Sequence, residues 1–313
     1  MTSEPSLLQM PDIALNEIAK KCDYVSIQSL RKVCRDLRNF IEDIKPQYDF
    51  TNISIKLGAF HLYLIFNGPA NIWEPPPGKK VTILYKNDRW NCSVSLKKSS
   101  RQRSKLLRDT NFVECFCRDF AIAMRSQKSI IQNFYMSLSD QKTDRVWEVL
   151  HAELFTSETS RIVDFLQLLD PNYLETIKIS GDCFMNELTE MTEVCQLEQF
   201  KKAKELDILT FFISCPVENF SHFEKVTVWY MGVSLEMLRS LKEMFITSSN
   251  LSSFLIHSMN CDRDMISTVF GHSDEHQSTE DIIKWVMMIP GSDDVIIVER
   301  EPFRVKFERK KKN

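Results

Sequence analysis

The chain has 313 residues, of which 43% are hydrophobic and 27% are charged, close to the balance of an average globular protein, so a packed core is expected. The formal net charge of −3 makes no case for a nucleic-acid or membrane partner. Seven glycines are too few to favour a fold that cradles phosphates on Gly-rich loops, and no apolar run reaches the roughly 18 residues that span a bilayer.

The nine cysteines are scattered along the chain and form no C-x-x-C pair. The first ten residues have neither the basic nor the apolar stretch of a signal peptide. We therefore expect reduced thiols that serve as small core residues in an intracellular protein, cytoplasmic or nuclear.

Residues 8–46 have the pattern of a compact helical unit. Pro11 and Asp12 suit a helix start, and a strongly amphipathic stripe with apolar residues three and four apart follows. Val33 falls off this stripe, which indicates either a second apolar face or a break between two helices near Cys34.

Residues 50–110 are strand-like. Segments 81–85 and 90–96 have β-rich, partly alternating character, and segment 86–89 between them suits a hairpin turn. The stretch 97–108 carries six basic residues and no acidic one. We interpret it as a solvated loop, with a phosphate- or phosphopeptide-binding patch as the alternative.

Residues 111–313 alternate helix-like and strand-like segments. Helical stripes are expected at 112–124, 146–154, 162–169, 235–245 and 282–289. Short apolar runs are expected as strands at 134–138, 174–179, 205–209, 226–229 and 254–257. Strand–helix–strand connections favour parallel pairing, because each one must cross back over a face of the sheet. The runs 295–298 and 303–307 around Pro302 predict a terminal antiparallel hairpin.

The predicted fold class is α/β. A small N-terminal helical unit (8–46) and a strand-rich connecting region (50–110) precede an α/β recognition domain (111–313) with a mostly parallel sheet and hairpins near its ends. Its strands start at irregular intervals of about 20 to 40 residues, which resembles a degenerate leucine-rich-repeat solenoid.

The helical unit has a surplus of apolar residues. At about 40 residues it is near the size below which a chain needs a metal, a disulfide or a partner to stay folded. It has no metal-ligand spacing, and its apolar positions exceed what one small core hides. We expect the surplus to pack on another protein or on the domain that follows, and the pattern does not choose between them.

The N-terminal residues carry a family resemblance. Residues 10–13 (Met-Pro-Asp-Ile), the Cys22-Asp23 step and residues 30–40 (Leu-Arg-Lys-Val-Cys-Arg-Asp-Leu-Arg-Asn-Phe) resemble an F-box, and the last run is similar to the F-box A proteins, a group expanded in nematodes. Leucine is commoner in F-boxes where Met10 and Cys22 stand here. The resemblance implies that a surface for a Skp-type adaptor is formed by Met10, Pro11, Ile13, Ile18, Cys22, Leu30, Val33, Cys34 and Leu37.

The rest of the chain resembles the FTH domain, which follows the F-box in that group. The matching stretches are 165–179, 197–208 and 220–223. The resemblance implies a substrate-recognition adaptor of an SCF-type (Skp–cullin–F-box) ubiquitin ligase, without a catalytic residue, cofactor or metal. The adaptor and cullin would hold an unknown target protein at high effective concentration beside the ubiquitin-conjugating enzyme.

Two other classes of function remain as alternatives. The first is a protein-interaction scaffold that no longer engages a ligase, in which the F-box-like helices only pack on the body. The second is a metalloenzyme, because His272, Glu275 and His276 match an H-x-x-E-H zinc pattern. The flanks of this match are polar and loop-like, so we attribute it to chance.

A repeat-like α/β domain usually binds partners on its strand-lined face or the nearby loops. We therefore expect the target protein to contact side chains such as Lys178, Asp207, Trp229 and His257.

Overall fold

The structure is a computed structural model that describes residues 10–44, 46, 48, 50–58, 60–66, 80–98, 101–125, 127, 129–137, 149–156, 158–181, 188–273 and 282–311. The chain divides into two compact units, Met1–Gln132 and Asn133–Asn313, and each is described by itself. No helix in the described part of the chain is long and apolar enough to cross a membrane.

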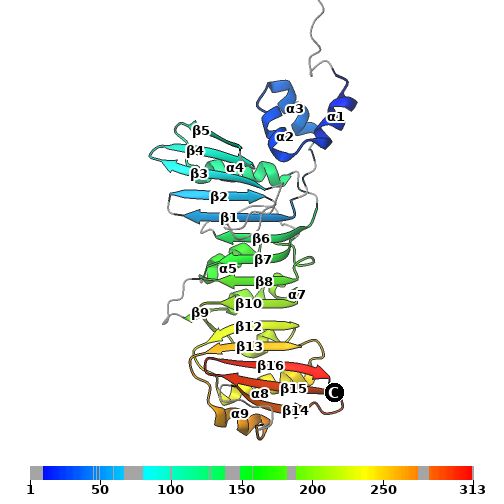
Figure 1. The fold of residues 1–313 in the computed structure, drawn as a ribbon, viewed down its shortest axis with the longest axis vertical. Coiled ribbons are helices and arrows are strands. Elements are labelled where there is room, and N and C mark those ends of the chain that lie inside the picture. Colours follow the sequence, from blue (N-terminus) through cyan, green and yellow to red (C-terminus); the bar gives the residue numbers. More distant parts are fainter. Residues whose placement is uncertain are drawn as a thin grey trace, which may run out of the picture. The chain divides into compact units, whose positions relative to one another are not determined.

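In its described residues the first unit combines helices α1 to α4 with an antiparallel sheet (Figure 1). Its helices are α1 (Asp12–Lys21), α2 (Tyr24–Leu30), α3 (Arg35–Ile44) and α4 (Phe112–Arg125). Its strands are β1 (Asn52–Gly58), β2 (His61–Phe66), β3 (Val81–Asp88), β4 (Asn91–Lys98) and β5 (Arg101–Leu107), which neighbour one another in chain order with every pair antiparallel.

Helices α1 to α3 form the predicted N-terminal helical unit. Helix α2 ends at Leu30 and α3 begins at Arg35, so the predicted break near Cys34 is confirmed. The core of these helices is made by one apolar face of each, and its buried members are Leu15, Ala19, Tyr24, Ile27, Leu37 and Ile41.

Aromatic packing joins the helical unit to the strands of the first unit. The Tyr24 ring lies 5.1 Å from the Phe66 ring and 5.6 Å from the Phe50 ring, measured between centroids. Asp23 adds an ion pair to Lys98 of β4. Part of the apolar surplus of the helices is therefore buried against the segment that follows them.

The hairpin β3–β4 is longer than predicted, and the basic stretch is not a loop. Strand β3 runs on to Asp88, which leaves the tight turn Arg89–Trp90. The interpretation of residues 97–108 as a solvated loop is wrong, because β4 continues to Lys98 and β5 returns from Arg101 to Leu107. Basic side chains fit an edge strand, because there they remain in water while the backbone pairs on one side.

The second unit consists mainly of one sheet and its covering helices. Its strands are β6 (Ile131–Ser137), β7 (Val149–Phe155), β8 (Thr176–Ser180), β9 (Leu188–Glu190), β10 (Glu205–Leu209), β11 (Phe212–Ser214), β12 (Lys225–Tyr230), β13 (Ser253–Ser258), β14 (Ile283–Met288), β15 (Asp294–Glu301) and β16 (Arg304–Lys311). Its helices are α5 (Thr159–Leu166), α6 (Thr192–Gln196), α7 (Glu198–Lys202), the 3-10 helix η2 (Val217–Phe220), α8 (Leu235–Thr247) and α9 (Arg263–Phe270). The strand order is β14-β15-β16-β13-β12-β10-β8-β7-β6, and β9 and β11 form a separate pair.

The α/β class is confirmed, but the prediction of a mostly parallel sheet is wrong. Parallel pairing links β7, β8, β10, β12 and β13, where helices provide the crossovers. Strands β14 to β16 pair antiparallel, as do all strands of the first unit. The connections β14–β15 and β15–β16 are short turns, and a short turn can only reverse the chain. The leucine-rich-repeat character of the parallel part stays a prediction.

Two predicted helices are strands. Segment 146–154 contributes β7, and segment 282–289 contributes β14. Both runs are short and rich in apolar residues at spacings that fit either period, so the partner strands decide their conformation. Trp285, for example, is fully buried and lies opposite Val298 in the β14–β15 hairpin. The terminal hairpin around Pro302 is confirmed by the β15–β16 pair.

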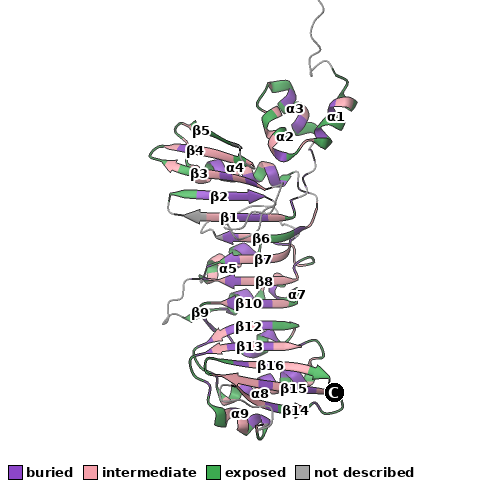
Figure 2. Ribbon diagram, viewed as in Figure 1, coloured by how far each residue is buried: buried purple, intermediate pink, exposed green. Residues whose placement is uncertain are grey.

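One face of the second unit's sheet is closed by helices and one is partly open. Along the parallel strands buried and half-buried residues alternate, as Figure 2 shows. Phe220 of η2 packs on Phe254 of β13, and Phe245 of α8 packs on Phe307 of β16, so the buried face is the one under the helices. Eight cysteines in the described part of the chain are free thiols, as expected, and Cys183 lies outside that part.

Candidate functional site

The F-box-like helices present large apolar side chains to solvent. Ile13 in the first turn of α1 is 81% exposed, and Val33 in the turn between α2 and α3 is 68% exposed. Met10, Pro11 and Ile18 are exposed as well. Single exposed apolar residues are normal, but several on one small helical unit indicate a surface meant for a protein partner.

The other residues predicted to bind the adaptor are less accessible. Cys22, Leu30 and Cys34 are half-buried, and the Cys34 sulfur accepts a hydrogen bond from the Leu37 amide at 3.5 Å. Leu37 is only 4% exposed and lies in the helical core. Leu37 is therefore removed from the predicted surface, because its side chain is committed to packing inside the unit.

Charged contacts hold the exposed apolar residues in place. Asp23 caps α2 by accepting a hydrogen bond from the Ser26 amide at 2.8 Å. Partial burial opposes ionisation of Asp23, but hydrogen bonds from Lys98 and Ser26 outweigh it and lower the pKa of this carboxyl. Arg31 forms an ion pair with Glu42 at 2.7 Å, which links the end of α2 to α3. The Arg31–Glu42 pair thus joins the two helices that flank the turn carrying Val33.

The four residues predicted to contact a target lie together on the partly open face of the parallel sheet. Lys178 of β8 lies directly opposite Asp207 of β10, and Trp229 of β12 lies directly opposite His257 of β13. All four are half-buried. The structure thus brings them together as expected, while their binding of a target stays a prediction.

Trp229 and His257 form the aromatic part of this face. Their rings stack with centroids 4.6 Å apart and an interplanar angle of 13°. Burial, with a smaller effect of the Arg304 charge, lowers the pKa of His257, which favours the neutral imidazole. The Trp229 Nε1 is buried and has no hydrogen-bond partner among the described residues.

Lys178 and Asp207 form the charged part of the same face. Burial raises the pKa of Asp207, and the nearby Lys178 opposes that rise. The Asp207 Oδ1 is buried without a partner in the described part of the chain, while Lys178 lies 3.9 Å from Glu153 of β7. A carboxylate oxygen left without a donor costs free energy, so it is a feature that a bound partner could satisfy.

Sequence reasoning missed two residues of this face. Glu153 was overlooked because its segment was predicted to be a helix, although it lies opposite Lys178. Arg304 of β16 lies opposite His257 and could not be placed, because the sequence does not give the pairing of β16 with β13. A strict period-two analysis of residues 149–155 would have been the available signal for Glu153.

The zinc-like pattern receives no support. His272 is exposed, and Glu275 and His276 lie outside the described residues. Within the residues that the structure describes, no group of three or more His, Cys, Asp or Glu side chains is arranged to hold a metal ion.

Comparisons with known proteins match both parts of the chain. Residues 7–47 match the F-box domain family, and residues 128–273 match the FTH domain family. The chain is similar to F-box A protein 224 from Caenorhabditis elegans, at 23% identity over 302 residues that cover 87% of this chain and 72% of the relative. No solved structure matches the chain. The order of domains expected from the sequence is confirmed.

Proposed function

We propose that this F-box protein, which has the F-box and FTH domains of the F-box A family, recruits a target protein to a cullin-type ubiquitin ligase. An F-box ahead of a second folded domain is the organisation of a substrate adaptor. The observation that carries the proposal is the exposure of Ile13 and Val33 on the helices that match the F-box.

The proposed mechanism is positional. The F-box helices bind a Skp-type adaptor, the adaptor binds a cullin, and the second unit holds the target protein. Tethering raises the effective concentration of target lysines near the ubiquitin-conjugating enzyme. No side chain of this chain needs to act as an acid, a base or a nucleophile, so we propose a non-enzymatic role. Cullin ligases work inside cells, and we place the protein in the cytoplasm or the nucleus.

Co-expression with a Skp-type adaptor tests the first contact. The wild-type chain should co-purify with the adaptor, and a Pro11→Ala, Ile13→Ala variant should lose it. Burying an isoleucine side chain contributes about 1.5–3 kcal/mol, so removing Ile13 alone should weaken binding at least about tenfold. Both positions are exposed, so the variant should remain folded.

A Phe303→Ala variant is the matched control. Phe303 is also a highly exposed apolar residue, at 69%, but lies in the β15–β16 turn of the second unit. Its loss should leave adaptor binding unchanged. A folded wild-type chain that ignores the adaptor would instead favour the interaction scaffold, for which the burial of Tyr24 against Phe50 and Phe66 already provides a packing role.

The target contact is tested separately on the sheet face. Trp229→Ala and Lys178→Ala should each reduce the set of proteins captured by the chain, whereas Trp90→Ala, in the exposed β3–β4 turn, should not. Circular dichroism establishes that each variant is folded. Captured sets identical to that of the wild type in both face variants would refute the assignment of this face.

A further inference from the structure

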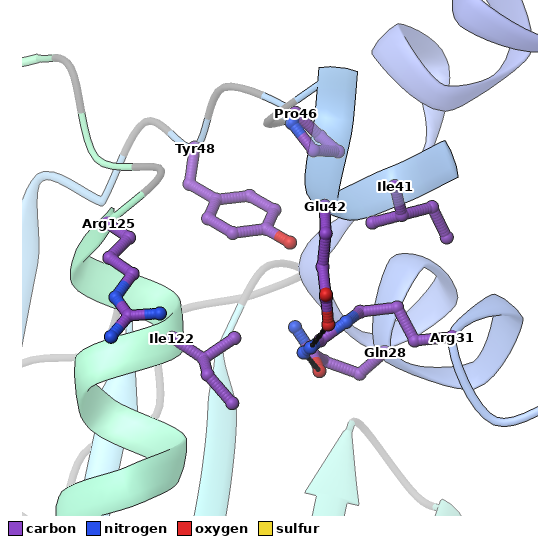
Figure 3. A pocket seen from close by; sticks show the side chains of 8 residues that line it. All are labelled: Gln28, Arg31, Ile41, Glu42, Pro46, Tyr48, Ile122 and Arg125. Carbon is purple, nitrogen blue, oxygen red and sulfur yellow. Dashed lines mark hydrogen bonds and ion pairs between the residues drawn. The ribbon is translucent and has the colours of Figure 1, made fainter. Parts of the chain in front are cut away.

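A cavity of about 350 Å³ lies within the first unit, between helices α2 and α3 on one side and helix α4 on the other. Figure 3 shows Arg125, Ile122 and Tyr48 on one side of it and the Arg31–Glu42 pair on the other. Cavities that hold small organic ligands begin at about 300 Å³, so this one is large enough for a small organic molecule.

The polar lining of the cavity has an excess of positive charge. Two guanidinium groups, Arg31 and Arg125, face a single carboxylate, Glu42. The Arg31 Nη2 donates to Glu42 Oε1 at 2.7 Å and its Nη1 donates to Gln28 Oε1 at 3.1 Å. No ion pair to Arg125 occurs among the described residues. One positive charge at the cavity, that of the exposed Arg125, is therefore left without a counter-charge from the described part of the chain.

Buried hydrogen-bond donors add to this positive field. The Nε of Arg31 and the Nε2 of Gln28 are both buried, and neither has an acceptor of good geometry in the described residues. A buried donor without an acceptor is costly, and it leaves a positive partial charge that attracts an anion. Arg31 is 15% exposed at its side chain, so its charge is screened less than that of a surface arginine.

The remaining lining is apolar. Ile41 and Tyr48 are buried and Ile122 is half-buried. Burial raises the pKa of Tyr48 to about 12, against smaller opposing effects of Gln28 and Arg31, so the Tyr48 ring carries a neutral hydroxyl. A ligand for this cavity thus needs an acidic group for the arginines and an apolar or aromatic body for the isoleucines and the tyrosine ring.

We propose that the cavity binds a small organic anion, with a phosphate or carboxylate group between Arg31 and Arg125 and a ring or short hydrocarbon body against Ile122 and Tyr48. Guanidinium groups recognise the oxygens of planar carboxylates and of tetrahedral phosphates through paired N–H donors. Because the cavity is lined by the F-box helices and by α4, the ligand links these helices and stabilises the unit. This site does not depend on the proposed role in a ubiquitin ligase.

Isothermal titration of the full chain with phenyl phosphate and with benzoate tests the proposal. At least one of the two should bind with a dissociation constant of about 1 mM or tighter, and phenol, which lacks the acidic group, should bind at least about tenfold more weakly. Arg125→Gln should weaken binding of the anion at least about tenfold. Arg118→Gln, also on α4 but not lining the cavity, should leave it unchanged.

A second variant separates the cavity from a general surface charge effect. Ile122→Trp should fill the apolar part of the cavity and abolish binding, while a thermal unfolding curve shows that the chain is still folded. The proposal is overturned if neither anion binds the folded wild-type chain, if phenol binds as well as the anions, or if the Arg125 and Ile122 variants bind like the wild type.

Discussion

At Trp229 and His257 an aromatic pair lies on the partly open face of the sheet, beside the charged pair Lys178 and Asp207. Stacked rings on a strand surface give a rigid contact area at low cost in side-chain entropy, which is what a protein-binding face requires. The neutral state of His257 is favoured by burial and by the Arg304 charge. The stability of the unit that carries this face should therefore decrease in acid.

The stability of the second unit should fall as the pH falls below about 6.5, the ordinary histidine pKa. Burial lowers the folded-state pKa of His257 and of His222. At higher pH both side chains are neutral in the folded and in the unfolded chain, so they do not change the free energy of unfolding there. Below the unfolded pKa the unfolded chain binds the protons first, and stability is lost until the folded pKa is passed.

Urea unfolding at pH 7.5 and 5.5 measures this loss, which cannot exceed about 1.4 kcal/mol per pH unit for one histidine. A His257→Gln variant should show a smaller difference between the two pH values than the wild type. An equal difference in the two proteins would show that His257 does not titrate as described.

Individual residues show which parts of the candidate site the sequence predicts and which parts it does not. Val33 falls off the apolar stripe of the helices, which agrees with its exposed position at the break between α2 and α3. Leu37 was included by resemblance, but it continues the stripe and is buried. The stripe alone would have excluded Leu37. For Arg304 no such signal existed, because strand pairing across the chain decides its neighbours.

The connection between α3 and β1 is held by the Gln127 side chain in addition to the aromatic packing of Phe50. Gln127 accepts a hydrogen bond from the Phe50 amide at 3.1 Å and donates to the Phe50 carbonyl at 3.0 Å and to the Ser129 carbonyl at 2.9 Å. Gln127 is buried, so water does not replace these bonds. The Gln127 amide thus satisfies both backbone groups of Phe50 in the segment that follows the N-terminal helices.

Gln127→Ala should destabilise the first unit by about 2–4 kcal/mol, because it leaves buried backbone groups of Phe50 without partners at about 1–3 kcal/mol each. Chemical denaturation measures the change. Gln102→Ala, on the exposed surface of β5, is the control and should change the free energy of unfolding by less than about 0.5 kcal/mol. Equal effects of the two substitutions would contradict the role of Gln127.

Helix α8 begins as the sequence predicts. The Ser234 hydroxyl accepts a hydrogen bond from the Met237 amide at 3.1 Å and so caps the N-terminus of the helix. Ser234→Ala should cost about 1 kcal/mol of unfolding free energy in the second unit, as measured by denaturation. The same change at Ser240, inside the helix, should be neutral or slightly stabilising, since alanine is the better helix former there. A cost at Ser240 as large as at Ser234 would argue against the cap.

The sequence predicts whether a segment is a helix or a strand better than it predicts which strands pair. Strand β10 was predicted at its observed bounds, and α4 and α8 were predicted within one or two residues. The β3–β4 hairpin was found, but with a turn that was too long. The parallel character was overestimated because the short connections among β14, β15 and β16 reverse the chain, unlike the helical crossovers between β7 and β13.

The two proposed binding functions, for the adaptor and for the target, belong to different units of the chain. The adaptor surface belongs to the first unit, and the candidate target face belongs to the second. Substitutions at sites that share no contacts should be additive. The Pro11→Ala, Ile13→Ala variant should thus keep the target interactions of the wild type, and Trp229→Ala should keep its adaptor binding.

We propose above all that the exposed apolar residues of α1 and of the α2–α3 turn bind a Skp-type adaptor. Hydrogen–deuterium exchange of the full chain with and without purified adaptor tests it most directly. We predict slower exchange in residues 10–22 and 30–34 when the adaptor is present, with no change in strands β8 to β13. Unchanged exchange in those N-terminal segments at saturating adaptor, or protection confined to the second unit, would contradict the proposed binding of the adaptor.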